Sequence, residues 1–229
     1  YFPMPYFLDP SRNTAFVGTN TEYSVFDLGQ EDNNFWTWEV WNGTEVSFLV
    51  LAGDSPQDVV SLLTAEMGRP TETPPDWAFS GVWLAAQGGT EKIEARLKTA
   101  LDAGIPVSAM WVQDWVGLRN FGDDQFGVKY RWIHDEELYP NLKKTIADMR
   151  EKGVRFLGYF NNFVLPTYEH WDEASSKGYL IQDADGEPYT FTISTFPGSI
   201  LDITNPEAVA YFKGFAQKAV DLGMSGWMS

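Results

Sequence analysis

The sequence contains no cysteine, which excludes disulfide bonds, thiolate nucleophiles and cysteine-based metal sites. Histidine is nearly absent as well. His134 and His170 are far apart and lack the spacing of a ligand pair, so we expect no metal ion and no other cofactor. No apolar run reaches the roughly 18 residues that a membrane-spanning helix needs, so we expect no membrane span.

Basic residues are also scarce. There are 16 Lys and Arg against 32 Asp and Glu, which gives a net charge of −16. Such a field repels nucleic acids and anionic membranes, and we expect neither as a partner. The opening residues, "YFPMPYFLDP", lack the basic and apolar regions of a secretory signal. Together with the lack of cysteine, this favours a cytoplasmic location, and the start without Met suggests a piece of a longer protein.

Aromatic residues, by contrast, are abundant. They make up 16% of the chain, with ten Trp and ten Tyr. Flat side chains with one polar edge suit the walls of sugar-binding clefts. An aromatic core would account for most of them equally well.

Residues 1–52 alternate as antiparallel strands do. The strand-like runs are "YSVFDLG", "FWTWEVW" and "EVSFLVLAG", and they are separated by "GQEDNN" and "NGT". A helix is predicted next, with Ser55 as its cap, Pro56 in its first turn and Gly68 at its end. The proline-rich "RPTETPPDW" then predicts a boundary between domains at 1–70 and 71–229.

Residues 71–229 alternate between apolar strands and amphipathic helices. The pattern predicts four such units, with strands at "FSGVWLAAQ", "PVSAMWVQDW", "VRFLGYFNNFV" and "GSILDIT", before "MSGWMS" begins another strand. It also predicts a hairpin with an Asp-Gly turn in "YLIQDADGEPYTFTI". Repeated strand–helix units indicate a parallel sheet, and continuous apolar strands indicate that both faces are covered.

Two folds fit this alternation: a (β/α)8 TIM barrel and a doubly wound sheet. The turn after the first strand, "QGGTE", lacks the spacing of a dinucleotide-binding loop. Polar residues gather where strands end, and in a barrel such ends share the mouth that holds the active site. They are Gln87, Gln113, Asp114, Asn161, Asn162 and Asp202. We therefore favour the barrel, of which four and a half units would form the first half.

Several stretches resemble glycoside hydrolase family 31, and its sulfoquinovosidase branch in particular. They are "PDW", "GVWLAAQGGTE", "WVQDWVGLR", "ELYPNL", "GVRFLGYFNNFV", "KGYLIQDADG", "LDITNPEAVAYFK" and "GWM", in that order. The part that opens with "YFPMPYF" resembles the end of the antiparallel β-sandwich that precedes the barrel in this family. The resemblance implies a retaining α-glycosidase for small-molecule carbohydrates, either α-glucosides or sulfoquinovosides.

The reaction implied by this resemblance needs two carboxyl groups about 5–5.5 Å apart. In the family the nucleophile is an Asp shortly after "GWM", and here that stretch is followed only by Ser229. We therefore expect both catalytic Asp residues beyond residue 229, and the remainder of the barrel from the parent chain. Residues 1–229 alone are expected to be inactive.

The residues left to bind substrate lie mostly at strand ends. The resemblance implies that Gln87 and Gln113 bind sulfonate oxygens, and strand-end capping is the alternative from the residues alone. Asp114 either holds sugar hydroxyls or is a solvated loop acid. Of Trp111 and Trp115, one is expected to line the pocket and the other to pack in the wall. Trp227 of "GWM" is included among the substrate-binding candidates.

One departure from the branch concerns the sulfonate. The branch has an Arg and, three residues later, a Trp after "QDW", and these positions fall on Gly127 and Tyr130. Glycine cannot replace the charge-assisted bonds of a guanidinium. Tyr130 could replace the indole donor, and Lys129 or Arg131 could supply the charge.

Two other functions fit less of the sequence. A non-catalytic carbohydrate-binding protein would use the aromatic and amide residues alone, and sugar binding by this chain would reveal it. A nucleotide-binding domain would need a phosphate-binding glycine-rich turn at a helix N-terminus, for which "QGGTEK" is the one weak candidate.

Overall fold

The computed structural model describes residues 4–29, 35–70, 72–120, 126–193 and 196–229. The chain divides into two compact units, Tyr1–Thr73 and Pro74–Ser229, and the division falls inside the proline-rich connector. Within the described ranges, every helix is too short or too polar to cross a membrane. The two units are described separately below.

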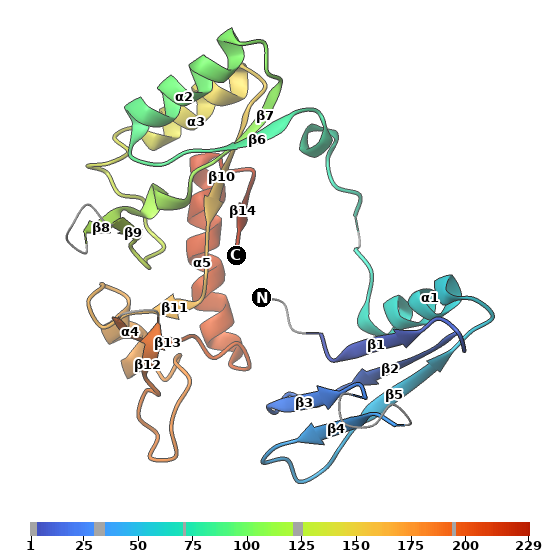
Figure 1. The fold of residues 1–229 in the computed structure, drawn as a ribbon. Coiled ribbons are helices and arrows are strands. Elements are labelled where there is room, and N and C mark those ends of the chain that lie inside the picture. The colour runs from blue at the N-terminus through green and yellow to red at the C-terminus, as the bar shows by residue number, and fades with distance from the viewer. Residues whose placement is uncertain (1–3, 30–34, 71, 121–125, 194–195) are drawn as a thin grey trace. The chain divides into compact units, whose positions relative to one another are not determined.

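Antiparallel strands build the first unit (Figure 1). One sheet has the order β1-β2-β5, and a separate pair joins β3 to β4. The strands are β1 (Tyr6–Asp9), β2 (Thr14–Gly18), β3 (Ser24–Asp27), β4 (Thr37–Val40) and β5 (Phe48–Ala52). The helix α1 (Pro56–Met67) follows β5, with the Ser55 hydroxyl accepting a hydrogen bond from the amide of Asp58. This helix begins and ends where the sequence predicted.

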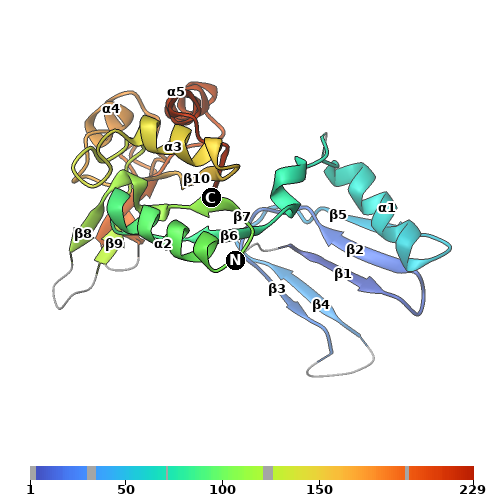
Figure 2. The same cartoon turned by 90° about the horizontal axis from the view of Figure 1, so that it is seen from above.

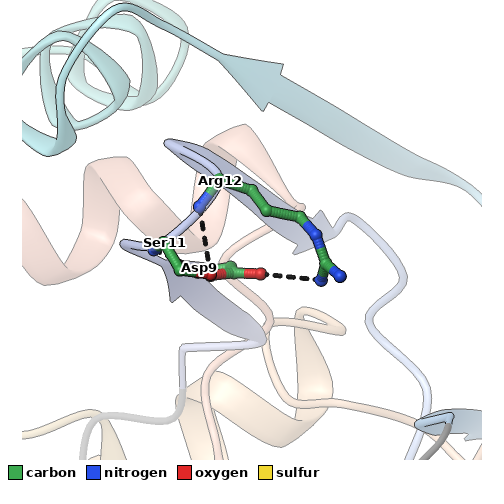
Figure 3. A network of polar contacts seen from close by, with 3 residues as sticks. All are labelled: Asp9, Ser11 and Arg12. Atoms are coloured by element: carbon green, nitrogen blue, oxygen red, sulfur yellow. Dashed lines mark hydrogen bonds and ion pairs between the residues drawn. The ribbon is translucent and has the colours of Figure 1, made fainter.

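Asp9 closes the turn between β1 and β2 (Figure 3). Its Oδ1 accepts hydrogen bonds from the amide and hydroxyl of Ser11, at 2.9 and 2.6 Å. Its Oδ2 pairs with the guanidinium of Arg12 at 3.0 Å. The Ser11 hydroxyl is the main cause that holds the pKa of Asp9 below its ordinary value. The turn fixes the register of the two strands, with Asp9 opposite Thr14.

Four parallel strands form the centre of the second unit. They lie in the order β14-β10-β7-β6, which is the order of the chain read backwards. Their bounds are β6 (Val82–Ala85), β7 (Val107–Trp111), β10 (Arg155–Tyr159) and β14 (Gly226–Met228). A doubly wound sheet reverses its strand order at a switch point, and the described sheet contains no such reversal. The order therefore supports a barrel-type sheet.

Three helices connect these strands and pack against one face of the sheet (Figure 2). They are α2 (Thr90–Asp102), α3 (Leu142–Glu151) and α5 (Pro206–Leu222). Leu84, Met110 and Phe156 stand in register on this face and share one hydrophobic core with the helices. The helical side of that core includes Ile93, Leu97, Ile146, Met149, Phe215 and Ala219. Side chains alternate along a strand, so Ala85, Trp111 and Leu157 lie on the other face.

The prediction that "GSILDIT" is a fourth parallel strand is wrong. β13 (Phe196–Ile200) pairs antiparallel with β11 (Phe163–Val164) and with β12 (Phe191–Ile193). The fourth parallel strand is β14, which pairs with β10. The error has a physical reason, because an apolar run predicts a strand but not its partner. Here the chain forms the short strand β11 soon after β10, and β13 pairs with β11 instead of joining the parallel sheet.

Asp202 follows β13 and therefore does not lie at an end of the parallel sheet. Its Oδ1 accepts hydrogen bonds from the amide and hydroxyl of Thr204, and it closes the turn before α5. The predicted Asp-Gly hairpin turn is present, with Gln182 opposite Pro188. The remaining elements are short: β8 (Leu118–Asn120) paired with β9 (Phe126–Val128), the helix α4 (Trp171–Ser176), and 3₁₀ turns at Asp76–Phe79 and Gln113–Val116.

Candidate functional site

Two glutamine side chains meet beyond the carboxyl ends of β6 and β7. The last ladder pair joins Ala85 to Trp111, and the amide of Ala86 still donates to the carbonyl of Trp111 at 3.1 Å. Gln87 and Gln113 each lie two residues beyond that pair. The Nε2 of Gln87 donates to the Oε1 of Gln113 at 2.8 Å. Both amides therefore lie on one edge of the sheet.

A cavity of about 400 Å³ adjoins this amide pair. Its lining comes from the ends of both strands and from α2: Ala85, Ala86, Gln87, Arg96, Trp111 and Gln113. The indole Nε1 of Trp111 is buried and has no hydrogen-bond partner among the described residues. The cavity thus combines a flat aromatic wall with amide groups, which is a lining suited to a sugar ring.

Asp114 directly follows Gln113, and its side chain is fully buried. Its Oδ2 accepts a hydrogen bond from the amide of Gly88 at 2.7 Å, and its Oδ1 accepts one from the hydroxyl of Tyr139. The idea that Asp114 is a solvated loop acid is therefore wrong. Both of its oxygens bind groups of the protein, so the structure does not bring them to the cavity beside Gln87 and Gln113.

Burial dominates the electrostatics of this carboxylate. It raises the pKa of Asp114 above its ordinary value, although the hydrogen bonds from Tyr139 and Gly88 and the charge of Lys92 act in the opposite direction. Burial, with the adjacent Asp114, also raises the pKa of Tyr139 far above that of a free phenol. Tyr139 therefore remains a hydroxyl donor at every physiological pH.

Two glycines allow the loop after β6 to reach Asp114. Gly88 and Gly89 have φ values of 98° and 100°, a region that side chains other than that of glycine rarely adopt. The amide of Gly89 donates to the hydroxyl oxygen of Tyr139 at 3.3 Å. A Cβ at Gly89 would lie 2.9 Å from the carbonyl oxygen of Leu138. The backbone of this loop therefore packs too closely for a larger residue.

Trp115 packs in the wall, whereas Trp111 lines the cavity. Trp115 is buried, and its indole Nε1 donates to the carbonyl of Tyr159 at 3.0 Å. This bond joins the turn after β7 to the end of β10. Asn161 is used locally, because its Oδ1 accepts from the amide of Phe163 and its Nδ2 donates to the hydroxyl of Tyr159.

Tyr130 lies in an aromatic cluster beside the β8–β9 pair. Its ring centroid is 5.5 Å from that of Phe163 and 5.4 Å from that of Phe196. The guanidinium of Arg119 lies 5.2 Å from the Tyr130 ring, and Arg119 stands opposite Gly127 across the two strands. Tyr130 is not among the residues that line the cavity at the amide pair.

The two cations that flank Tyr130 in the sequence, Lys129 and Arg131, have carboxylate partners. Lys129 pairs with Asp135 at 2.8 Å, and Arg131 pairs with Glu169 at 2.8 Å. Asp135 also accepts a hydrogen bond from the amide of Leu138 at 2.9 Å. Neither Lys129 nor Arg131 is therefore available to an anionic ligand without breaking an ion pair.

Trp227 lies away from the amide pair. It stands opposite Gly158, one residue beyond the pair formed by Leu157 and Gly226. Because side chains alternate, its ring lies on the face opposite Trp111, and its centroid is 5.2 Å from that of Phe160.

Sequence reasoning missed Tyr139 and Arg96 as neighbours of the candidate site. Tyr139 lies in "ELYPNL", a stretch that we noted only for its resemblance, and Arg96 is one charge on an amphipathic helix. Neither pattern says what the side chain contacts. Among the described residues, no group of three or more His, Asp or Glu side chains is placed to hold a metal ion.

Known proteins are similar to this chain in sequence. The family model "Glycosyl hydrolases family 31 TIM-barrel domain" matches residues 71–229. The whole chain is similar to sulfoquinovosidases from Escherichia coli (36% identical over 233 residues) and Agrobacterium fabrum (35% over 233 residues), and it covers 33% and 34% of their lengths. The chain thus spans about a third of these curated relatives.

Solved structures that are similar to this chain also include family 31 enzymes. A family 31 sulfoquinovosidase from E. rectale, in complex with an aza-sugar inhibitor, matches with a TM-score of 0.88 at 30% identity, over 100% of this chain and 33% of that one. A dextranase from Flavobacterium johnsoniae, complexed with glucose, matches with a TM-score of 0.81 at 21% identity, over 98% of this chain and 27% of that one. The second likeness concerns the fold alone.

Proposed function

The chain belongs to glycoside hydrolase family 31, and we propose that it forms one wall of the sugar pocket of a retaining α-glycosidase. The observation that carries this proposal is the hydrogen-bonded pair of Gln87 and Gln113 beside an aromatic-lined cavity. Parallel-strand barrels place their active sites at the carboxyl ends of the strands, which is where these two amides lie.

The amide pair keeps hydrogen-bonding capacity for a ligand. After the bond between them, Gln87 retains its Oε1 and a second N–H, and Gln113 retains both N–H groups. Donors and acceptors in one plane suit the hydroxyl groups of a pyranose, and the three remaining N–H groups suit sulfonate oxygens. Trp111 supplies an apolar wall for the ring.

The sheet supports a barrel as the setting of this pocket. Its strands follow chain order and its connecting helices pack on one face, as in an arc of a (β/α)8 barrel. We propose that this arc is the first half of the barrel, that the remainder comes from the parent chain, and that the antiparallel strands of residues 1–70 are the end of a β-sandwich.

The chemistry we propose is a double displacement. One carboxylate attacks the anomeric carbon and the other protonates the leaving oxygen and then activates water, at a separation of about 5–5.5 Å. Asp114, which directly follows Gln113, is buried with both oxygens engaged, so it fits neither role. We propose that both catalytic Asp residues lie beyond residue 229.

The substrates we propose are α-glucosides, including sulfoquinovosides. Similarity to sulfoquinovosidases over the whole chain supports a sulfonate. The three remaining N–H groups of the amide pair support it as well. The ion pairs of Lys129 and Arg131 argue against sulfonate binding by these two cations, and we propose that the amide pair binds the sulfonate.

The test uses the full-length protein with 4-nitrophenyl α-glucoside and 4-nitrophenyl α-sulfoquinovoside. We expect nitrophenol release, with the α-anomer as the first product in NMR spectra. Gln217→Ala serves as a control, because Gln217 lies on the exposed side of α5 and bonds Asp221 within the helix. Calorimetric binding of the sugars without hydrolysis would instead support a non-catalytic carbohydrate-binding protein.

A further inference from the structure

We propose that Asp114 is a positioning residue that sets the separation of Gln87 and Gln113. The inference rests on the proposed function, because it assigns the amide pair to substrate binding. Gly88 directly follows Gln87, and Asp114 directly follows Gln113. The same two turns are therefore joined twice: once by the amide pair at 2.8 Å and once by the Gly88 amide and Asp114 carboxylate at 2.7 Å.

The two bonds differ in their surroundings. The bond between the glutamines is exposed, so water competes for both of its partners. The bond to Asp114 ends on a carboxylate that is fully buried. Hydrogen bonds to an ionised acceptor are roughly twice as strong as neutral ones, and a buried carboxylate has no water to replace a lost donor. The Asp114 carboxylate therefore sets the separation of the two turns. The distance between the Gln87 and Gln113 side chains depends on that separation.

A second contact fixes the direction of the carboxylate. Tyr139 donates its hydroxyl to the other oxygen of Asp114 and is itself fully buried. The Tyr139 oxygen in turn accepts from the amide of Gly89. Asp114 thus holds Gly88 directly and Gly89 through Tyr139. The amide of Thr90 adds a backbone bond to the carbonyl of Leu138 at 3.2 Å.

These contacts require a carboxylate and not merely a polar residue of this size. Asn at this position has one acceptor oxygen and one NH₂ group. If its oxygen keeps the Gly88 amide, its NH₂ group faces the hydroxyl of Tyr139, whose oxygen already accepts from Gly89. The Tyr139 hydroxyl then loses its acceptor. Asp114→Asn therefore keeps the shape of the side chain but breaks the arrangement.

A double-mutant cycle in the full-length protein tests the proposal. We expect Asp114→Asn to lower kcat/KM on the α-glycoside substrate by about 10–100-fold, mainly through KM, in the otherwise wild-type protein. In the Gln87→Ala background the same change should cost less than about 3-fold, because the pair that Asp114 positions is already gone. An equal loss in both backgrounds would overturn the proposal.

Asp135→Asn is the matched control, because Asp135 is another largely buried acid that holds a nearby turn through Lys129 and Leu138. Asp135→Asn should change kcat/KM by the same factor in the otherwise wild-type protein and in the Gln87→Ala background. If Asp114→Asn does not fold, Tyr139→Phe replaces it in the cycle. That variant removes one donor to the carboxylate and should show the same non-additivity with a smaller loss.

A crystal structure of the Asp114→Asn protein separates this proposal from the proposed function. We expect the Gln87 Nε2 and Gln113 Oε1 atoms to lie beyond hydrogen-bond distance. A pair that stays at 2.8 Å would overturn the positioning role even if the enzyme hydrolyses α-glycosides. Separation of the pair in a protein without any glycosidase activity would support the positioning role and refute the proposed function.

Discussion

The ammonium group of Lys129 lies 2.8 Å from a carboxylate oxygen of Asp135, and the side chains are only 29% and 10% exposed. A short distance along the same loop, Arg131 is paired with Glu169. The positive charges of Lys129 and Arg131, on either side of Tyr130 in the chain, are therefore neutralised within the protein. A sulfonate bound by either of them would have to replace a carboxylate that is already held in position.

The first prediction concerns this ion pair and pH. Burial acts to raise the pKa of Asp135, but the hydrogen bonds from Lys129 and Leu138 and the charges of Lys129 and Arg131 outweigh it, so the pKa is lowered. A lowered pKa contributes stability above the ordinary pKa of an Asp, near 3.8, and that stability is lost as the pH falls through the lowered value.

Asp135→Asn should therefore reduce the free energy of unfolding by about 1–2 kcal/mol at pH 7. The difference from the wild type should shrink below about pH 4. Thermal denaturation at several pH values measures it. Asp148→Asn, in an exposed pair with Lys144, should cost about 0.5 kcal/mol or less. A difference for Asp135→Asn that is constant from pH 7 to pH 3 would contradict the prediction.

The second prediction concerns the amide pair. Gln87→Ala and Gln113→Ala should each weaken substrate binding about tenfold, because each removes one or two hydrogen bonds worth about 1.4 kcal/mol in total. Removing either partner also releases the other, so the double variant should lose less than the product of the single losses. Calorimetry with an unreactive α-glycoside measures binding, with Gln217→Ala as the control. Unchanged affinity in both single variants would remove the amide pair from the site.

The third prediction concerns the glycine turn after β6. Gly89→Ala should destabilise the fold by about 1–3 kcal/mol, because φ is 100° and the new Cβ would lie 2.9 Å from the Leu138 carbonyl. Gly214→Ala should instead stabilise it by up to about 1 kcal/mol, since Gly214 is exposed within α5 and a Cβ there meets nothing. Chemical denaturation of both variants checks the opposite signs. Equal effects would contradict the steric argument.

The fourth prediction compares two tryptophans. Trp115→Phe should cost about 1–3 kcal/mol, because the carbonyl of Tyr159 loses its donor inside the core. Trp227→Phe should change stability by about 0.5 kcal/mol or less, since Trp227 is 42% exposed and a phenyl ring can keep its contact with Phe160. Unfolding curves of the two variants, recorded side by side, measure the two losses of stability. A larger loss for Trp227→Phe would refute the assignment of Trp115 to the wall.

Local sequence signals predicted the helix α1 well. It begins at Pro56, after Ser55, whose side chain accepts from the amide of Asp58, and it ends before Gly68. Caps, terminal glycines and amphipathic spacing act within one or two turns of the chain, so they can be read without knowing the fold. The polar strand ends that suggested a shared edge are local signals too, and Gln87 and Gln113 do meet.

Partners that lie far apart in the sequence could not be predicted in this way. The pairing of β13 with β11, the burial of Asp114 against Tyr139 and the pairing of Arg131 with Glu169 each join distant segments. In each case the residue type allowed two outcomes: a parallel or antiparallel strand, a solvated or buried acid, a free or paired cation. Only the packing of the chain selects between them. The role of each residue in substrate binding stays a prediction.

The two outer strands of the parallel sheet each carry an exposed indole: Trp83 on β6 is 54% exposed and Trp227 on β14 is 42% exposed. Indole emission moves to shorter wavelength when water leaves the ring. The fluorescence of these two side chains can therefore report on a polypeptide that docks along β6 or along β14. A Trp83→Phe variant keeps the probe on β14, and a Trp227→Phe variant keeps the probe on β6.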